Sequence, residues 1–141
     1  MKDNIIFSKT WEDDDIIELK VKCSSSVATI SSKIYVSDSL IDELICQIKQ
    51  FLDGDIEEGF WANEDKGNDS TACLSLRFFK KDEQGHIIIE VFAELDDGGK
   101  FTEHNCCFFI GTEYGLLVSF CERLDCFKNH PVGYKICLNK N

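Results

Sequence analysis

The stretch FTEHNCCFFIGTEYGLL at residues 101–117 holds the side chains best suited to chemistry, a histidine two residues before a pair of adjacent cysteines. Imidazole and thiolate groups bind zinc, and together they supply the base and nucleophile of cysteine enzymes. However, the chain has no CxxC pair, and neighbours on a strand point to opposite faces, which separates Cys106 from Cys107. His104 and Cys106 share the face that we expect to be buried. The pattern therefore predicts a structural histidine beside a small core cysteine, with no metal and no cofactor.

Two other groups of residues fall short of a catalytic or metal-binding pattern. His86 and Glu90 have the types of an acid–base pair, but they lie on an expected strand with no cleft around it. The run EDDD at 12–15 lacks the spacing and the glycine of a calcium loop, and is typical of a solvated strand edge. The chain also lacks a glycine loop for phosphate. The sequence thus predicts that the protein is not an enzyme.

The charge of the chain is strongly acidic and unevenly distributed. The net charge is −11, and residues 1–70 hold 16 acidic and 7 basic side chains, against 10 and 8 in residues 71–141. Phosphates need positive partners, so nucleic acid is excluded as a direct ligand. A basic protein is the partner that this charge favours, since complementary potentials speed association. The alternative is that the acidity serves solubility alone.

The length and the N-terminal composition limit the number of domains and the compartment that we expect. The 141 residues fit a single domain over 1–141 that can bury a hydrophobic core without disulfides or a structural metal. The start, MKDNIIFSKTWEDDD, has no apolar run long enough for a signal peptide or membrane span, which predicts a cytoplasmic protein that does not bind a membrane. In that compartment the eight cysteines are reduced, and we expect most of them to fill the core.

The hydrophobic pattern predicts five strands, two helices and one long loop. Alternation indicates strands, and the i, i+3, i+4 spacing of Leu40, Ile41, Leu44 and Ile48 indicates an amphipathic helix that follows a serine cap. Thr112 is the expected cap of the second helix. A last short strand or ordered tail falls at 132–138. The predicted strands cover 15–23, 27–36, 72–80, 86–95 and 101–110, the helices 37–54 and 113–124, and the loop 53–71.

The order β-β-α-β-β-β-α predicts an α+β fold. Its simplest form is a single antiparallel twisted sheet of about five to six strands, with two helices packed on one face. A two-residue turn at Gly98 and Gly99 would pair Val91 with Cys106 and Ile89 with Phe108. The same register places Arg77 near Glu90 on the second face, which also carries Phe79, Ile88, Phe92 and Phe109. That face is too apolar to be fully solvated, so either a loop covers it or it is an interface.

The loop at 53–71 is the expected binding segment. It carries seven acidic residues and one lysine, and the adjacent aromatics Phe60 and Trp61 interrupt it. Such aromatics either pin a loop to the core or present an anchor to a partner.

The second half of the chain has a recognisable series of motifs. GFW is followed by LSLRFFKKDEQGHIIIEVFAEL and by HNCCFFIGTEYGLLVSFCERL, after an early helix that ends in QIKQFLDG. Over roughly residues 15–125 the chain resembles the small bacterial WapI-type immunity proteins and their uncharacterised relatives. The resemblance implies a fold without catalytic residues, and a protein that binds and neutralises a toxin domain, often a nuclease.

We therefore expect a cytoplasmic, non-catalytic immunity protein whose partner is a basic toxin domain. In this hypothesis acidic residues of the loop meet a basic cleft while the aromatics anchor the contact. The alternative is a housekeeping or ligand-binding domain, dimeric through the second sheet face. The predicted partner-binding residues are Asp55, Glu57, Glu58, Phe60, Trp61, Glu64 and Asp65.

Overall fold

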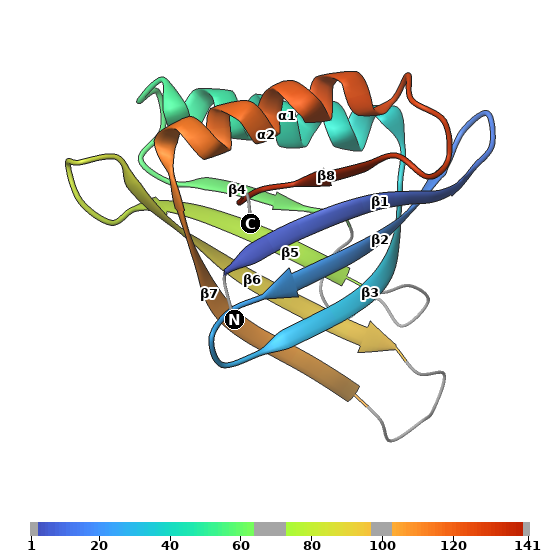
Figure 1. Ribbon diagram of the computed structural model, residues 1–141, viewed down its shortest axis with the longest axis horizontal. Helices are drawn as coiled ribbons and strands as arrows, with labels where there is room; N and C mark the ends of the chain where they lie inside the picture. Colours follow the sequence, from blue (N-terminus) through green and yellow to red (C-terminus); the bar gives the residue numbers. More distant parts are fainter. Residues whose placement is uncertain (1–2, 64–72, 97–102, 140–141) are drawn as a thin grey trace.

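The computed structural model describes residues 3–63, 73–96 and 103–139, which form eight strands and two helices (Figure 1). The first half holds β1 (Asn4–Glu12), β2 (Ile17–Ser24), β3 (Thr29–Val36), α1 (Asp38–Leu52) and β4 (Gly59–Ala62). The second half holds β5 (Cys73–Lys80), β6 (His86–Asp96), β7 (Glu103–Glu113), α2 (Tyr114–Phe127) and β8 (Lys135–Cys137).

The strands form two antiparallel sheets, so the α+β class is confirmed and the single sheet of five to six strands is wrong. One sheet has the order β3-β2-β1-β8 and the other β4-β5-β6-β7. The predicted order β-β-α-β-β-β-α omits β1 and β4, and the last short strand that was one alternative for 132–138 is present as β8. Because β1 pairs with both β2 and β8, the N-terminal hairpin becomes a sheet of its own, and α1 carries the chain across to the second sheet.

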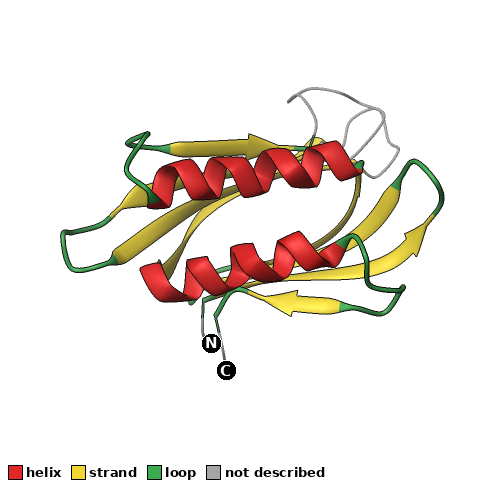
Figure 2. Cartoon of the chain, turned by 90° about the horizontal axis from the view of Figure 1, so that it is seen from above, coloured by secondary structure: helices red, strands yellow, loops and turns green. Residues whose placement is uncertain are grey.

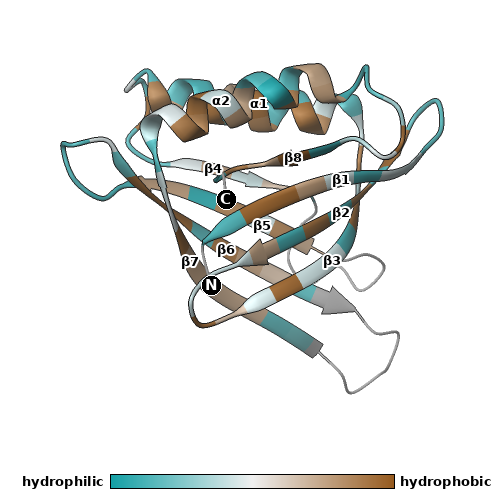
Figure 3. Ribbon diagram, viewed as in Figure 1, coloured by the Kyte–Doolittle hydropathy of each residue, from teal (hydrophilic) through white to brown (hydrophobic). Residues whose placement is uncertain are grey.

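The two sheets face each other and the helices close the open side between them. In Figure 1 one sheet lies in front of the other, and α1 and α2 lie above both. From above, the helices lie side by side and run in opposite directions (Figure 2). Helix α1 packs beside β4 and α2 beside β8, the upper edge strands of the two sheets. The brown and teal residues that alternate along the strands in Figure 3 follow from this arrangement, because each sheet buries one face.

One contiguous core contains the inner faces of both sheets and the apolar stripes of both helices. Phe7 of β1 meets Phe120 of α2 edge to face with ring centroids 5.6 Å apart, and Phe51 of α1 lies 6.1 Å from Phe78 of β5. The core therefore joins both sheets and both helices through large side chains.

The predicted amphipathic helix is confirmed as α1, and its start has the expected cap. The Ser37 hydroxyl oxygen accepts a hydrogen bond from the Leu40 backbone N–H at 3.2 Å. The predicted cap of the second helix is wrong. Glu113 is the capping residue of α2 and makes no side-chain cap bond, while the Thr112 hydroxyl donates to the Asn139 side-chain oxygen at 2.7 Å.

The register between β6 and β7 differs from the prediction by two residues. Val91 pairs with Phe108 and Ile89 with Ile110, whereas the turn that the prediction used, within 97–102, lies outside the described residues. A shift by two preserves the faces, so Phe108 and Val91 are buried as expected. His104, however, is exposed because it lies where the β6–β7 hairpin extends past the other sheet (Figure 1), and the prediction of a core histidine is wrong.

The C-terminal segment closes the fold through buried polar contacts. The Lys9 ammonium is fully buried and donates to the backbone carbonyl of His130 at 2.7 Å, beyond the end of α2. The Asn139 side-chain amide donates to the carbonyl oxygens of Asp3 and Gly111, at 2.8 and 2.9 Å. These contacts hold the last residues between the first strand and β7.

Candidate protein-binding site

The residues that suggested chemistry are dispersed or structural. The described residues contain no group of three or more His, Cys, Asp or Glu side chains that could hold a metal. The partner of His86 is Asp82, with Nδ1 2.7 Å from the carboxylate, whereas Glu90 lies 3.7 Å from Arg77. Asp82 also accepts from the Gln84 backbone N–H at 2.8 Å, which makes this pair part of the β5–β6 turn. The hydrogen bond from His86 lowers the pKa of Asp82 below its ordinary 3.8.

The cysteines do not form a reactive site, and only some of them fill the core. Burial raises the pKa of the Cys23 thiol to about 12, which removes its thiolate at neutral pH. The prediction that most cysteines are buried is wrong, because a similar number lie on solvent-facing positions of helices and strands. The buried ones are Cys23, Cys73 and Cys121, and the exposed ones are Cys46, Cys107 and Cys126.

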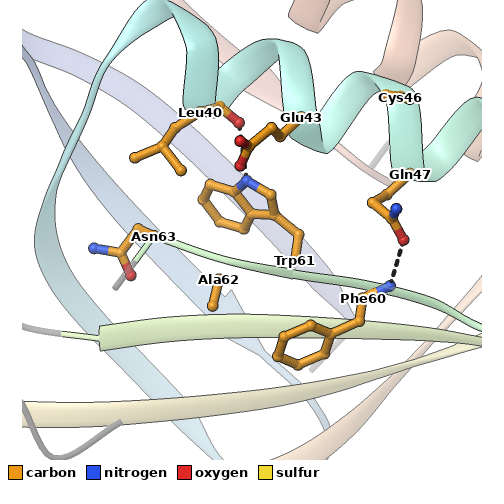
Figure 4. A pocket seen from close by; sticks show the side chains of 8 residues that line it. All are labelled: Leu40, Glu43, Cys46, Gln47, Phe60, Trp61, Ala62 and Asn63. Carbon is orange, nitrogen blue, oxygen red and sulfur yellow. Dashed lines mark hydrogen bonds between the residues drawn. The ribbon is translucent and has the colours of Figure 1, made fainter. Parts of the chain in front are cut away.

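A groove of about 550 Å³ runs between α1 and β4, at the start of the predicted binding loop (Figure 4). The α1 side comes from positions three, four and seven residues apart, which share one face of a helix. The β4 side comes from the whole strand and the residue after it. The lining residues are Leu40, Glu43, Cys46, Gln47, Phe60, Trp61, Ala62 and Asn63, of which Glu43 is charged and none is basic.

Strand alternation gives the two aromatics of this segment opposite roles. Trp61 points inward, is 3% exposed and donates its indole N–H to the Leu40 backbone carbonyl at 2.9 Å. Phe60 points outward and is 42% exposed, with the Arg77 guanidinium 4.7 Å from its ring centroid. Trp61 therefore pins the segment to the core, while Phe60 remains available to a partner.

The sequence showed no strand at Gly59–Ala62, where the structure has β4. This strand pairs with β5 on one side and forms the edge of its sheet. The Phe60 backbone N–H points away from β5 and donates to the Gln47 side-chain oxygen at 3.0 Å (Figure 4). The aperiodic acidic context hid the strand, and its four residues GFWA show no alternation of apolar and polar side chains.

Three of the acidic residues predicted to bind a partner precede β4, the strand that lines the groove. Asp55, Glu57 and Glu58 are all exposed between α1 and β4. Glu58 lies 3.6 Å from Arg77, an ion pair between half-exposed side chains that solvent screens strongly. Glu64 and Asp65 lie outside the described residues.

The second face of the β4–β7 sheet carries a row of paired side chains that the sequence predicted in part. Phe60, Arg77, Glu90 and Phe109 lie opposite one another across four strands, and the predicted Arg77–Glu90 pair is confirmed. Phe109 is 54% exposed. Trp61 points to the other side of the sheet, so it does not cover this face.

Comparison with known proteins gives one distant likeness in fold. No protein-family model matches the chain, and no curated protein matches it. One chain of a CdiA-CT/CdiI toxin and immunity complex from Enterobacter cloacae superposes with a TM-score of 0.49 and 9% sequence identity, over 85% of this chain and 97% of that one. No helix among the described residues has the length and apolar character to cross a membrane.

Proposed function

We propose that this chain is a non-catalytic immunity protein that binds and neutralises a toxin domain through the acidic surface around α1 and β4. The observation that carries the proposal is the position of the exposed Phe60 ring between a groove without basic lining residues and the exposed acids of 55–58. A large aromatic side chain can act as the anchor of a binding hot spot, and charged residues beside it can select the partner.

The negative charge of the protein favours a basic partner for this surface. With a net charge of −11, the protein attracts a basic partner over long range, and the attraction weakens as salt screens it. Toxin domains that cleave nucleic acid carry positive charge to bind phosphates. A nuclease domain is thus the proposed target, and the cytoplasm is the proposed compartment.

The predicted residues have different roles in this proposal. Asp55, Glu57 and Glu58 supply charge, and Phe60 supplies the apolar contact. Trp61 positions the strand from the core side, with its side chain almost fully buried. Glu43 joins the set because it lines the groove from α1.

A second candidate function rests on the apolar outer face of the β4–β7 sheet. Phe109 is more than half exposed there, and Phe79, Ile88 and Phe92 beside it are half-buried. A face of this kind suits a homodimer of a housekeeping or ligand-binding domain. Mass measurement in solution tests this second candidate, since a monomer contradicts it.

The direct test uses the gene next to the one that encodes this chain. We expect it to encode a large secreted protein, whose purified C-terminal domain should bind this protein with an affinity that falls as salt rises. Co-expression should also protect cells from that domain. Failure of the domain to bind, or binding without protection, contradicts the proposed function.

A further inference from the structure

The edge of β4 presents backbone hydrogen-bonding groups to the groove. Residues of an antiparallel strand alternate between bonding to the neighbour and pointing away from it. The Asn63 backbone N–H donates to the Leu74 carbonyl of β5 at 3.2 Å, so Trp61 and Asn63 bond inward. Phe60 and Ala62 therefore direct their N–H and C=O groups away from β5.

The Gln47 side chain occupies the place of a missing strand at one of these positions. Its amide oxygen accepts from the Phe60 N–H at 3.0 Å, as a backbone carbonyl of a neighbouring strand would. Ala62 lies two residues further along the strand, and no side chain among the described residues bonds to its outward backbone groups. An edge that is half satisfied by a flexible side chain can exchange that contact for a strand at small cost.

The groove and its charge define the segment that fits. The distance from Phe60 to Asn63 accommodates about four extended residues at about 3.3 Å each. Glu43 lines the α1 wall, and Asp55, Glu57 and Glu58 lie exposed beyond the start of β4. Arg77, on the outer face, is already engaged by Glu58 and Glu90. Glu58 is thus paired, while Glu43, Asp55 and Glu57 leave net negative charge for an incoming strand.

We propose that β4 binds an extended, lysine- or arginine-rich segment of a protein partner as an added fifth strand of its sheet. The backbone groups of Phe60 and Ala62 would bind the segment, and the acids would select its charge. The proposal rests on the proposed function, because it names the part of the basic partner that the acidic surface receives.

The test uses a synthetic Lys-Val-Lys-Val-Lys-Val peptide and its Glu-Val counterpart, and the indole N–H of Trp61 reports binding by NMR. The variant Ala62→Pro removes only the outward N–H, a position where an edge strand tolerates proline. Ala62→Ser is the matched control because it keeps that N–H. We expect the basic peptide to shift the Trp61 signal in the wild type and in Ala62→Ser, and to bind at least about tenfold more weakly to Ala62→Pro.

A second measurement needs no variant. Cys46 is exposed and lines this groove, whereas the exposed Cys126 lines a different one between α1 and α2. The basic peptide should slow maleimide labelling of Cys46 at least about fivefold and leave Cys126 unchanged, because an added strand shields only its own groove.

Four results would overturn the proposal. They are equal binding of the acidic peptide, undiminished binding to a folded Ala62→Pro, no protection of Cys46, and a concentration-dependent shift at Ala62 in the protein alone, which would make a second copy the occupant. None of these touches the proposed function, since the toxin domain is measured separately. If the toxin domain binds the Ala62→Pro variant as tightly as the wild type, the immunity role stands, but the edge of β4 takes no part in it.

Discussion

The indole N–H of Trp61 donates to the backbone carbonyl of Leu40 at 2.9 Å, which joins β4 to the first turn of α1. This bond sets the orientation of the candidate surface. With Trp61 held inward, strand alternation turns the Phe60 side chain outward. The backbone N–H and C=O groups of Phe60 and Ala62 then point into the groove. The geometry of the surface therefore depends on a side chain that is itself almost fully buried.

Substitution of the two aromatics should separate stability from binding. Trp61→Ala removes a buried ring and should lower the free energy of unfolding by about 3–5 kcal/mol. Phe60→Ala truncates an exposed ring and should cost less than about 1 kcal/mol, while it weakens toxin binding. Urea unfolding under reducing conditions checks both values. Similar losses of stability in the two variants would show that Phe60 is part of the core.

The buried ammonium of Lys9 should contribute to stability through the C-terminal end of α2. It donates to the carbonyls of His130 and Lys128 at 2.7 and 3.3 Å, and lies 3.0 Å from the Glu12 carboxylate. Lys9→Met leaves these acceptors without their donor and should lower the free energy of unfolding by about 1–3 kcal/mol. The control is Lys20→Met at an exposed position of β2, which should change it by less than about 0.5 kcal/mol. Equal effects of the two changes would contradict this role.

Thiol labelling of the native protein should follow burial. Iodoacetamide should modify Cys46, Cys107 and Cys126, which are exposed, well before Cys23, whose pKa of about 12 and burial both suppress the thiolate. Peptide mass spectrometry after a short exposure gives the order. Labelling of Cys23 as fast as Cys46 would mean that β2 is not in the core.

The turn between β5 and β6 should show a depressed carboxyl pKa. The His86 hydrogen bond holds the pKa of Asp82 below 3.8, so this carboxylate stabilises the fold above that pH. The contribution is lost as the pH falls through the lower folded-state pKa. An NMR titration of the Asp82 carboxyl carbon should report a pKa below 3.8 in the wild type, and a higher value in His86→Gln. An unchanged pKa in the variant would assign the shift to the turn backbone alone.

Local elements were predictable where one residue pattern determines one structure. The 3.6-residue period and serine cap placed α1, and alternation placed the strands that became β2, β3, β5, β6 and β7. The Arg77–Glu90 pair followed because the short turn before His86 constrains the register of its hairpin.

The division into two sheets was not predictable from the same patterns. In strand β1 the side chains of Ile5, Phe7 and Lys9 point inward. A lysine in a strand predicts a solvent-facing position, and only the fold brings the carbonyls beyond α2 close enough to bind its ammonium group. Pairing of β1 with β8 joins residues about 130 positions apart, and no local pattern encodes such a partner.

The exposure of the acidic segment was predictable, but the geometry of the groove beside it was not. The acids at 55–58 and the exposed Phe60 were selected correctly as surface residues, whereas Trp61 was not. Glu43 and Gln47 were missed because only the fold brings one face of α1 beside β4.

The most direct measurement compares two double charge reversals in binding to the neighbouring toxin domain. Glu43→Lys with Glu57→Lys alters the candidate surface. Asp14→Lys with Asp15→Lys makes the same change in net charge at the exposed β1–β2 turn, which lies at the other end of the long axis from the segment between α1 and β4 (Figure 1). We predict that the first pair weakens binding at least about tenfold at low salt, and that the second changes it less than about threefold. Equal losses from both pairs, or no loss from the first, would contradict the assignment of this surface.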